Sequence, residues 1–275
     1  MKRNCLLVLG FLVCGMCFAQ RKITLDVDSA KEEFVKAGKL TVTPNDNSVS
    51  YSDGKITIEA AFEGAEYSVS GYFEGQVVLL TKNTVLKLAG AYIENNEGEP
   101  AVLCEAKAEV SSVENTVNYL VSRGTSSEKV AALHGRKNLV IGGSGTTYCL
   151  GNIYHGIKGD DVKIKGSGTL YSQGNEKGSA LNCRSLTVEQ GKTFKAYFIN
   201  SKNAIKADNT ITINSGEFYI YNNETAFKTD LLKDSPKEKH GVILYGGTFH
   251  LSGNTNLHST EKKAYLVRGA KIIGE

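Results

Sequence analysis

Hydrophobic and polar positions alternate along most of this chain. From Gly156 to Tyr171 the sequence reads GIKGDDVKIKGSGTLY, in which Ile157, Val162 and Ile164 alternate with polar residues. Alternation with a period of two predicts β-strands, because successive side chains of a strand point to opposite faces. Asp, Asn and Gly separate these short strands, and they tolerate the left-handed backbone that tight corners need.

The pattern recurs at a fixed interval. Residues 204–219 read AIKADNTITINSGEFY, and weaker copies begin at Ala132, Ala180 and Ala226. The copies starting at 132, 156, 180 and 204 are 24 residues apart. A fixed period of this size is typical of solenoids, and each repeat leaves too few residues for a helix. The sequence therefore predicts an all-β protein, a right-handed parallel β-helix with one coil per repeat.

Three segments are expected. Residues 1–19 have the features of a secretory signal peptide, with Lys2 and Arg3 before a short apolar stretch and Ala19 at its exit. Residues 20–65 lack the repeat and are expected to form strands that cap the open end of the solenoid. Residues 66–275 are expected to form the β-helix. The predicted location is outside the cytoplasm: periplasm, cell surface or extracellular space.

The alternative for the leader is a lipoprotein signal, since it contains Cys14 and Cys17. Such signals need a small residue just before the cysteine, and Val13 and Met16 are poor in that place. The apolar stretch is also too short to span a membrane. Plain secretion, with no membrane span, is therefore favoured.

Charge and cysteines narrow the function classes. The leader holds two of the 32 basic residues and no acidic ones, which leaves 30 basic against 29 acidic side chains. This near-neutral balance argues against a nucleic-acid partner, which needs a concentrated basic patch. Cys104 and Cys183 fall in one inward column three coils apart, about 14 Å, which is too far for a disulfide. These two cysteines and Cys149 are predicted to be free thiols of the core, in a protein expected to be a monomer.

Equivalent positions on successive coils stack into columns about 4.8 Å apart. One outward column reads His134, Lys158, Asn182, Lys206 and Lys228. Three lysines in line could hold the carboxylates of an anionic polysaccharide such as a uronate chain; the alternative is a solvated face without a ligand. The next outward column alternates in sign and predicts a self-neutralising ladder of salt bridges, each contributing about 0–1 kcal/mol: Arg136, Asp160, Arg184, Asp208 and Asp230.

A third column is aromatic. It contains Tyr148, Tyr171, Tyr219 and His250; in the intervening coil Lys195 stands in place of an aromatic residue, with Tyr197 beside it. Their neighbours in sequence are expected to point into the core, so these rings should point outward. Sugars present C–H faces to aromatic rings and hydroxyls to polar edges, which tyrosine can match. The alternative is that aromatic residues favour strands and stack on one another.

Several segments together resemble a known family. From about Tyr67 to Phe227 the chain resembles secreted bacterial carbohydrate-binding domain-containing proteins. The segments that carry the resemblance are YSVSGYFEGQVVL, LKLAGAYIEN, EPAV and VENTV, with the GIKGDD and AIKAD repeats. The resemblance implies a parallel β-helix related in architecture to pectate lyases. It also implies binding of cellulose and acidic plant polysaccharides, calcium sites and no established catalysis.

The calcium ligands in this chain would be Asp160, Asp161 and Asp208. Calcium takes six to eight oxygen ligands, and Arg184 lies between the two clusters. Family copies often carry Asp directly before the Gly-Ile pair, where this chain has other residues. In this chain the residues directly before that pair or its equivalent are His155, Ser179, Asn203 and Thr225. One weak calcium site is therefore the most that is expected.

The predicted function is non-catalytic binding of polysaccharide, either acidic (uronate-containing) or cellulosic. The first alternative is a polysaccharide lyase acting on uronate chains, which needs a base, a cation and a cleft. Arg184 or Lys206 beside Asp208 could serve there, although no spacing singles them out. The second alternative is a structural surface or adhesin solenoid. The sequence shows neither a Ser-His-Asp pattern nor a metal-ligand pattern of His and Cys.

Overall fold

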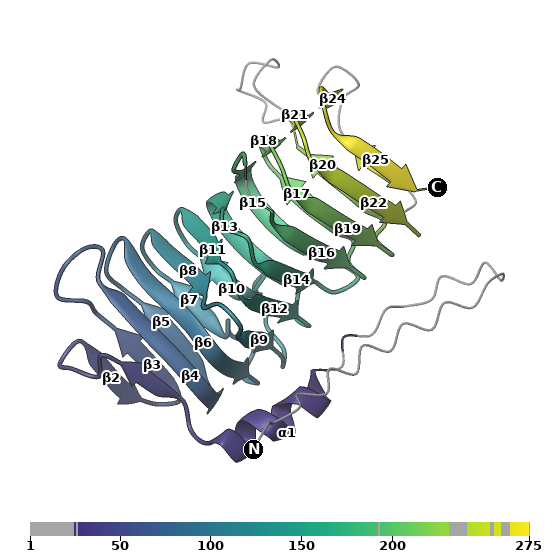
Figure 1. The fold of residues 1–275 in the computed structure, drawn as a ribbon. Helices are drawn as coiled ribbons and strands as arrows, with labels where there is room; N and C mark the ends of the chain where they lie inside the picture. Colours follow the sequence, from purple (N-terminus) through teal and green to yellow (C-terminus); the bar gives the residue numbers. More distant parts are fainter. Residues whose placement is uncertain are drawn as a thin grey trace, which may run out of the picture.

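The computed structural model describes Leu25 and residues 27–191, 193–230, 241–253, 256–259 and 265–274. In this part of the chain one helix, α1 (Asp28–Ala37), precedes 25 strands that join into one long, mostly parallel sheet. Figure 1 shows the strands stacked coil upon coil, from blue near the helix to yellow at the C-terminal end. This architecture is consistent with the all-β solenoid that the 24-residue period predicts. The handedness of the coil stays a prediction.

The strands stack in three ladders, A, B and C, one for each side of the coil. Four long strands bend at a corner and contribute to two ladders: β4 (Glu66–Glu74) and β6 (Thr84–Asn95) to B and C, and β13 (His155–Ile164) and β15 (Ser179–Val188) to A and B. The other strands of ladder A are β3 (Lys55–Ile58), β5 (Gln76–Leu79), β7 (Val102–Cys104), β10 (Ala131–Gly135), β17 (Asn203–Ala207), β20 (Thr225–Thr229) and β23 (Asn256–Ser259).

Ladders B and C continue the same coils. The other parallel strands of ladder B are β8 (Ala108–Ser112), β11 (Leu139–Gly143), β18 (Thr210–Ile213), β21 (Gly241–Leu244) and β24 (Tyr265–Val267). The others of ladder C are β9 (Val117–Ser122), β12 (Thr146–Gly151), β14 (Thr169–Gln173), β16 (Lys195–Ile199), β19 (Glu217–Tyr221), β22 (Thr248–Ser252) and β25 (Lys271–Gly274).

The register follows the hydrophobic pattern. Ile157 pairs with Leu181, Leu181 with Ile205, and Ile205 with Phe227. All four side chains are fully buried, which confirms the predicted interior column. A one-residue slip would expose the whole column, so burial of this face fixes which side chains face outward. Cys104, Cys149 and Cys183 are free and buried, as predicted, and burial raises the pKa of the Cys104 thiol to about 12.

The N-terminal region closes the first coils. β1 (Thr41–Thr43) pairs antiparallel with β4, and β2 (Val49–Ser52) pairs antiparallel with β3. Parallel pairing already begins at β3, inside the range expected for the cap. The predicted signal peptide, residues 1–19, lies outside the described residues. Among the helices of the described part, none is long and apolar enough to cross a membrane.

Helix α1 lies against the outer side of ladder C (Figure 1). The ring of Phe34 is 5.7 Å from each of the rings of Tyr92 and Tyr119. The Glu94 carboxylate, only 3% exposed, pairs with Lys31 at 2.5 Å and with Arg123 at 2.7 Å. A buried carboxylate needs such partners, since an uncompensated charge in the interior is costly. The helix is thus held by both ring packing and ion pairs.

Candidate functional site

The predicted lysine column lies on ladder A. Strand pairing places His134 next to Lys158, and carries the column on through Asn182, Lys206 and Lys228. His134 is buried, at 9% exposed, and the other four side chains are partly exposed. The register therefore confirms that these side chains form one column.

Four residues of this column, all except His134, line a cavity of about 320 Å³ that we call the lysine cleft. Corner loops add three more lysines: Lys129 from the loop before β10, Lys177 from the loop before β15, and Lys202 from the loop before β17. Three lysines of the column complete the set. The cleft thus gathers six ammonium groups: Lys129, Lys158, Lys177, Lys202, Lys206 and Lys228.

Most of this positive charge has no acidic partner among the described residues. Asp230 pairs with Lys206 at 2.7 Å and with Lys228 at 4.0 Å. The other four lysines form no ion pair with any described carboxylate. Lys158 instead donates to the Lys129 carbonyl oxygen at 3.3 Å. Burial lowers the pKa of Lys158, although the charge of Glu128 opposes this shift. Asp208 also lines the cleft, but the six lysines leave it a large excess of positive charge, which attracts ligands of the opposite sign.

The lysine cleft also contains neutral hydrogen-bonding groups. The Ser179 backbone N–H donates to Nδ1 of His155 at 3.0 Å. This bond requires an unprotonated Nδ1, so the neutral ring carries its proton on Nε2. Burial, followed by the charge of Lys158, lowers the pKa of His155 to about 3. His155 therefore contributes a donor to the lysine cleft without contributing charge.

Acidification is expected to destabilise the fold. Burial lowers the pKa of His134 to about 4 and that of His155 to about 3, below the ordinary value near 6.5. The unfolded chain takes up these protons at higher pH than the folded protein does, so the free energy of unfolding falls as pH drops below about 6.5. Urea titrations at about pH 7 and about pH 4.5 should show this loss. A His134→Asn, His155→Asn variant should lose less; an equal loss in both proteins would contradict the assignment.

The predicted salt-bridge ladder in the neighbouring column is wrong. Arg184 pairs with Asp161 through two contacts, Nε at 3.1 Å and Nη2 at 2.5 Å, rather than with Asp160 or Asp208. Arg136 pairs with Glu105 at 3.0 Å. An arginine side chain is long enough to reach carboxylates in more than one column, so strand register alone does not determine its ion-pair partner.

The carboxylates implied as calcium ligands do not fit that ion. Asp161 is held by Arg184, and Asp208 lines the lysine cleft, where burial raises its pKa. No group of three or more His, Cys, Asp or Glu side chains in the described part is arranged to hold a metal ion. Calcium takes six to eight oxygen ligands. Asp160, Asp161 and Asp208 do not provide such a set.

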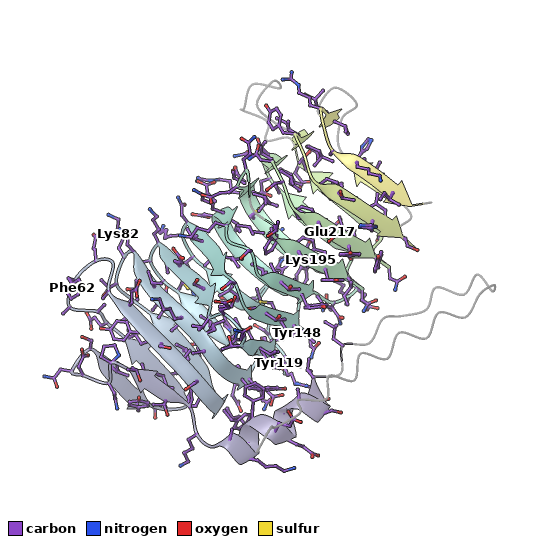
Figure 2. The ribbon with its side chains drawn as sticks, in the orientation of Figure 1. Phe62, Lys82, Tyr119, Tyr148, Lys195 and Glu217 are labelled. Atoms are coloured by element: carbon purple, nitrogen blue, oxygen red, sulfur yellow. The ribbon has the colours of Figure 1, made fainter. Side chains whose placement is uncertain are left out.

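The aromatic column on ladder C is longer than predicted. Tyr148, Tyr171 and Tyr219 do lie in one column that ends at His250, but Tyr197, not Lys195, fills the intervening coil. We call the five tyrosines of this column with nearly parallel rings the tyrosine stack; successive centroids are 4.3–4.8 Å apart at angles of 5–11°. They are Tyr119, Tyr148, Tyr171, Tyr197 and Tyr219. Figure 2 labels the first two.

The stacking limits how sugars could meet these rings. The faces of Tyr148, Tyr171 and Tyr197 lie against the neighbouring rings on both sides. Each ring is only partly exposed, so it presents an edge and a hydroxyl rather than a face. Burial raises the pKa of Tyr148 to about 12, which keeps its hydroxyl a hydrogen-bond donor at neutral pH. The stack can therefore act as a row of hydroxyls.

Sequence reasoning missed residues in both places. Lys129, Lys177 and Lys202 lie in corner loops of unequal length, where no period indicates their position. Tyr119 lies on β9, before the first of the regularly spaced copies at Ala132. The spacing of tyrosines on ladder C was the only signal that could have located it.

A long stack of parallel coils with side chains in columns presents an extended binding surface. The carbohydrate-binding domain-containing protein family matches residues 52–164 and 159–272, and the chain belongs to this family. A solved structure, a polysaccharide lyase-like protein from C. thermocellum in a gadolinium derivative, is similar in fold, with a TM-score of 0.52 and 20% identity over 84% of this chain and 90% of that one. No curated protein matches the sequence significantly.

Proposed function

We propose that this protein binds acidic polysaccharide in the lysine cleft without cleaving it. The observation that carries the proposal is the set of four cleft lysines that lack a described acidic partner. Like charges held together destabilise the empty protein, and an anionic ligand would relieve that repulsion. Membership of a carbohydrate-binding family supports a glycan as the source of the anion. A uronate chain, with one carboxylate on each sugar, has the matching chemistry.

The ligand would lie along the lysine column, from coil to coil. Lys158, Lys206 and Lys228 would then meet successive carboxylates, while His155 and Asn182 would hydrogen-bond hydroxyl groups. Lys129, Lys177 and Lys202 would close over the chain from the corner loops. The tyrosine stack, with Tyr148, Tyr171 and Tyr219, lies on another ladder and would contact a different stretch of glycan.

We also propose that the coils of the solenoid wind in the right-handed sense, and that the protein is exported and is a monomer. Parallel strands joined by a crossover are right-handed in about 98% of cases. The pattern of residues 1–19 supports secretion.

A polysaccharide lyase remains the second candidate, on one specific observation. Lys158 lies in the cleft with its pKa lowered by burial, and an ammonium group with a lowered pKa can act as a base. A base beside clustered positive charge could remove the proton next to a uronate carboxylate. The charges that hold the carboxylate would then also stabilise the resulting anion.

Affinity electrophoresis through gels containing polygalacturonate tests the proposal. The protein should be retarded, and the retardation should weaken as salt screens the ammonium groups. A chelator should leave retention unchanged, since the charge that meets the carboxylates comes from lysine. Absence of retardation at low salt would contradict binding and favour a structural role. Release of unsaturated oligosaccharides would replace the proposal with the lyase.

A further inference from the structure

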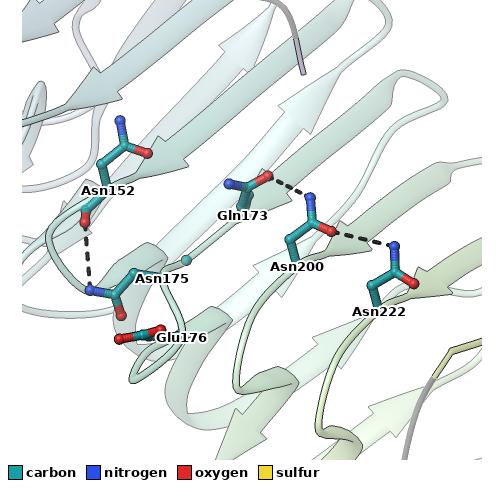
Figure 3. A pocket seen from close by; sticks show the side chains of 7 residues that line it. Asn152, Gln173, Asn175, Glu176, Asn200 and Asn222 are labelled. Carbon is teal, nitrogen blue, oxygen red and sulfur yellow. Dashed lines mark hydrogen bonds between the residues drawn. The ribbon is translucent and has the colours of Figure 1, made fainter. Parts of the chain in front are cut away.

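A second cavity, of about 570 Å³, lies where the strands of ladder C end. We call it the amide groove, because five of its lining side chains are amides and the sixth is a carboxylate (Figure 3). These residues follow or end strands β12, β14, β16 and β19. They are Asn152, Gln173, Asn175, Glu176, Asn200 and Asn222.

The amide groove and the lysine cleft share the same corner loops. Asn175 lines the groove and Lys177 lines the cleft; Asn200 and Lys202 repeat this arrangement on the next coil. These loops therefore contribute residues to both cavities. The chemistry of the two cavities differs sharply, since no lysine or arginine among the described residues lines the amide groove.

Three amides form a row across successive coils. Asn200 donates through Nδ2 to Oε1 of Gln173 at 3.0 Å, and Asn222 donates through Nδ2 to Oδ1 of Asn200 at 3.5 Å (Figure 3). Asn175 has a different task, because its Oδ1 accepts the backbone N–H groups of Lys177 and Gly178 at 2.9 Å each and so orders the corner loop. The row therefore runs along the groove from coil to coil.

Backbone geometry explains only part of this row. Asn200 and Asn222 have φ of 49° and 54°, in the left-handed region that asparagine tolerates better than most residues. Gln173 has no such constraint. It pairs in register with Leu150 and Ile199, which are 4% and 1% exposed. The neighbouring coils thus place an apolar side chain where this coil places an amide at the groove.

The strand that carries Gln173 also joins the groove to the tyrosine stack. Tyr171 and Gln173 are both partly exposed on β14, and the residues between and beside them are buried. Both side chains therefore lie on the outer side of ladder C. The row of phenol hydroxyls borders the row of amides along several coils.

We propose that the amide groove is a second carbohydrate site, for a neutral glycan. An amide both donates and accepts hydrogen bonds, as a sugar hydroxyl does. Glu176 is the single ionisable side chain among the described lining residues, and it would repel an anionic chain and accept hydrogen bonds from hydroxyls. The site does not depend on the lysine cleft, and a mixed polysaccharide with charged and neutral stretches could occupy both cavities.

The test uses the full chain with Gln173→Leu, Asn200→Gly and Asn222→Gly. Leucine matches the neighbouring coils, and glycine keeps the left-handed corners while removing their amides. In gels containing hydroxyethylcellulose, xyloglucan or mixed-linkage glucan, the parent protein should be retarded by at least one. The variant should bind that glycan about tenfold more weakly or worse and keep its retention on polygalacturonate. A Lys158→Gln, Lys177→Gln, Lys202→Gln variant should show the reverse pattern.

The inference is overturned if none of the three neutral glycans retards the parent, or if the folded triple variant keeps full retention. Circular dichroism and thermal unfolding establish whether that variant is folded. If it is not, Gln173→Leu alone decides the matter, and unchanged neutral-glycan binding by this single variant also overturns the inference. If the parent does not bind polygalacturonate, that result counts against the lysine cleft as an anion site. It does not affect the conclusion about the amide groove.

Discussion

Replacing Lys158, Lys177 and Lys202 by Glu is expected to reduce the affinity for polygalacturonate by about 100-fold or more. Each substitution turns an attractive contact with a carboxylate into a repulsive one, and like charges at an interface cost several kcal/mol. These three lysines are chosen because none has a described acidic partner, so the folded protein loses no ion pair. The shifts in affinity electrophoresis give the dissociation constants directly.

A matched control carries the same change in net charge away from the cleft. Lys36, Lys82 and Lys107 are exposed and do not line the lysine cleft. Their replacement by Glu should weaken retention only through the general field, by a few-fold at low salt, and hardly at all when salt screens it. Equal losses in the cleft variant and the control would mean that net charge, not the cleft, determines binding.

Phe218→Ala is expected to lower the free energy of unfolding by about 3–5 kcal/mol. Phe218 is fully buried, and its ring stacks on Phe249 at 4.9 Å and an angle of 12°. Phe194 packs edge-on against it at 6.3 Å. Alanine would leave a cavity that the neighbouring coils cannot fill without losing register. Domains of ordinary stability have about 5–15 kcal/mol in total, so urea denaturation should show an early transition.

Phe62→Ala is the control for this core substitution. Phe62 is 68% exposed, at the edge of the molecule in Figure 2, so its truncation should change stability by about 0.5 kcal/mol or less. Hydrogen exchange should place the effect of Phe218→Ala in the coils around β19 and β22, because each coil of a solenoid contacts only its neighbours. A Phe218 variant as stable as the control would contradict the assigned core.

The regular coils were predictable and the corners were not. Ile157 and its column follow from alternation, because a strand with one buried face tolerates no slip. The repeat spacing puts Lys195 in the aromatic column, but Tyr197 occupies that place. The reason is that the corner before β16 differs in length from those of the neighbouring coils. The same variation hides Lys177 and Lys202, whose place in the lysine cleft depends on loop geometry. The pairing of Arg184 with Asp161 depends on the reach of a long side chain, which no alternation encodes.

Helix α1 gives the outer side of ladder C a direction. With Val27, it covers Tyr92 and Val121 at the N-terminal coils, while Tyr171, Tyr197 and Tyr219 further along remain partly exposed. Among the described residues, the row of hydroxyls is thus covered by the helix at one end and uncovered at the other. A glycan bound to this row as proposed would meet the helix at one end only, where the chain would have to stop or bend away.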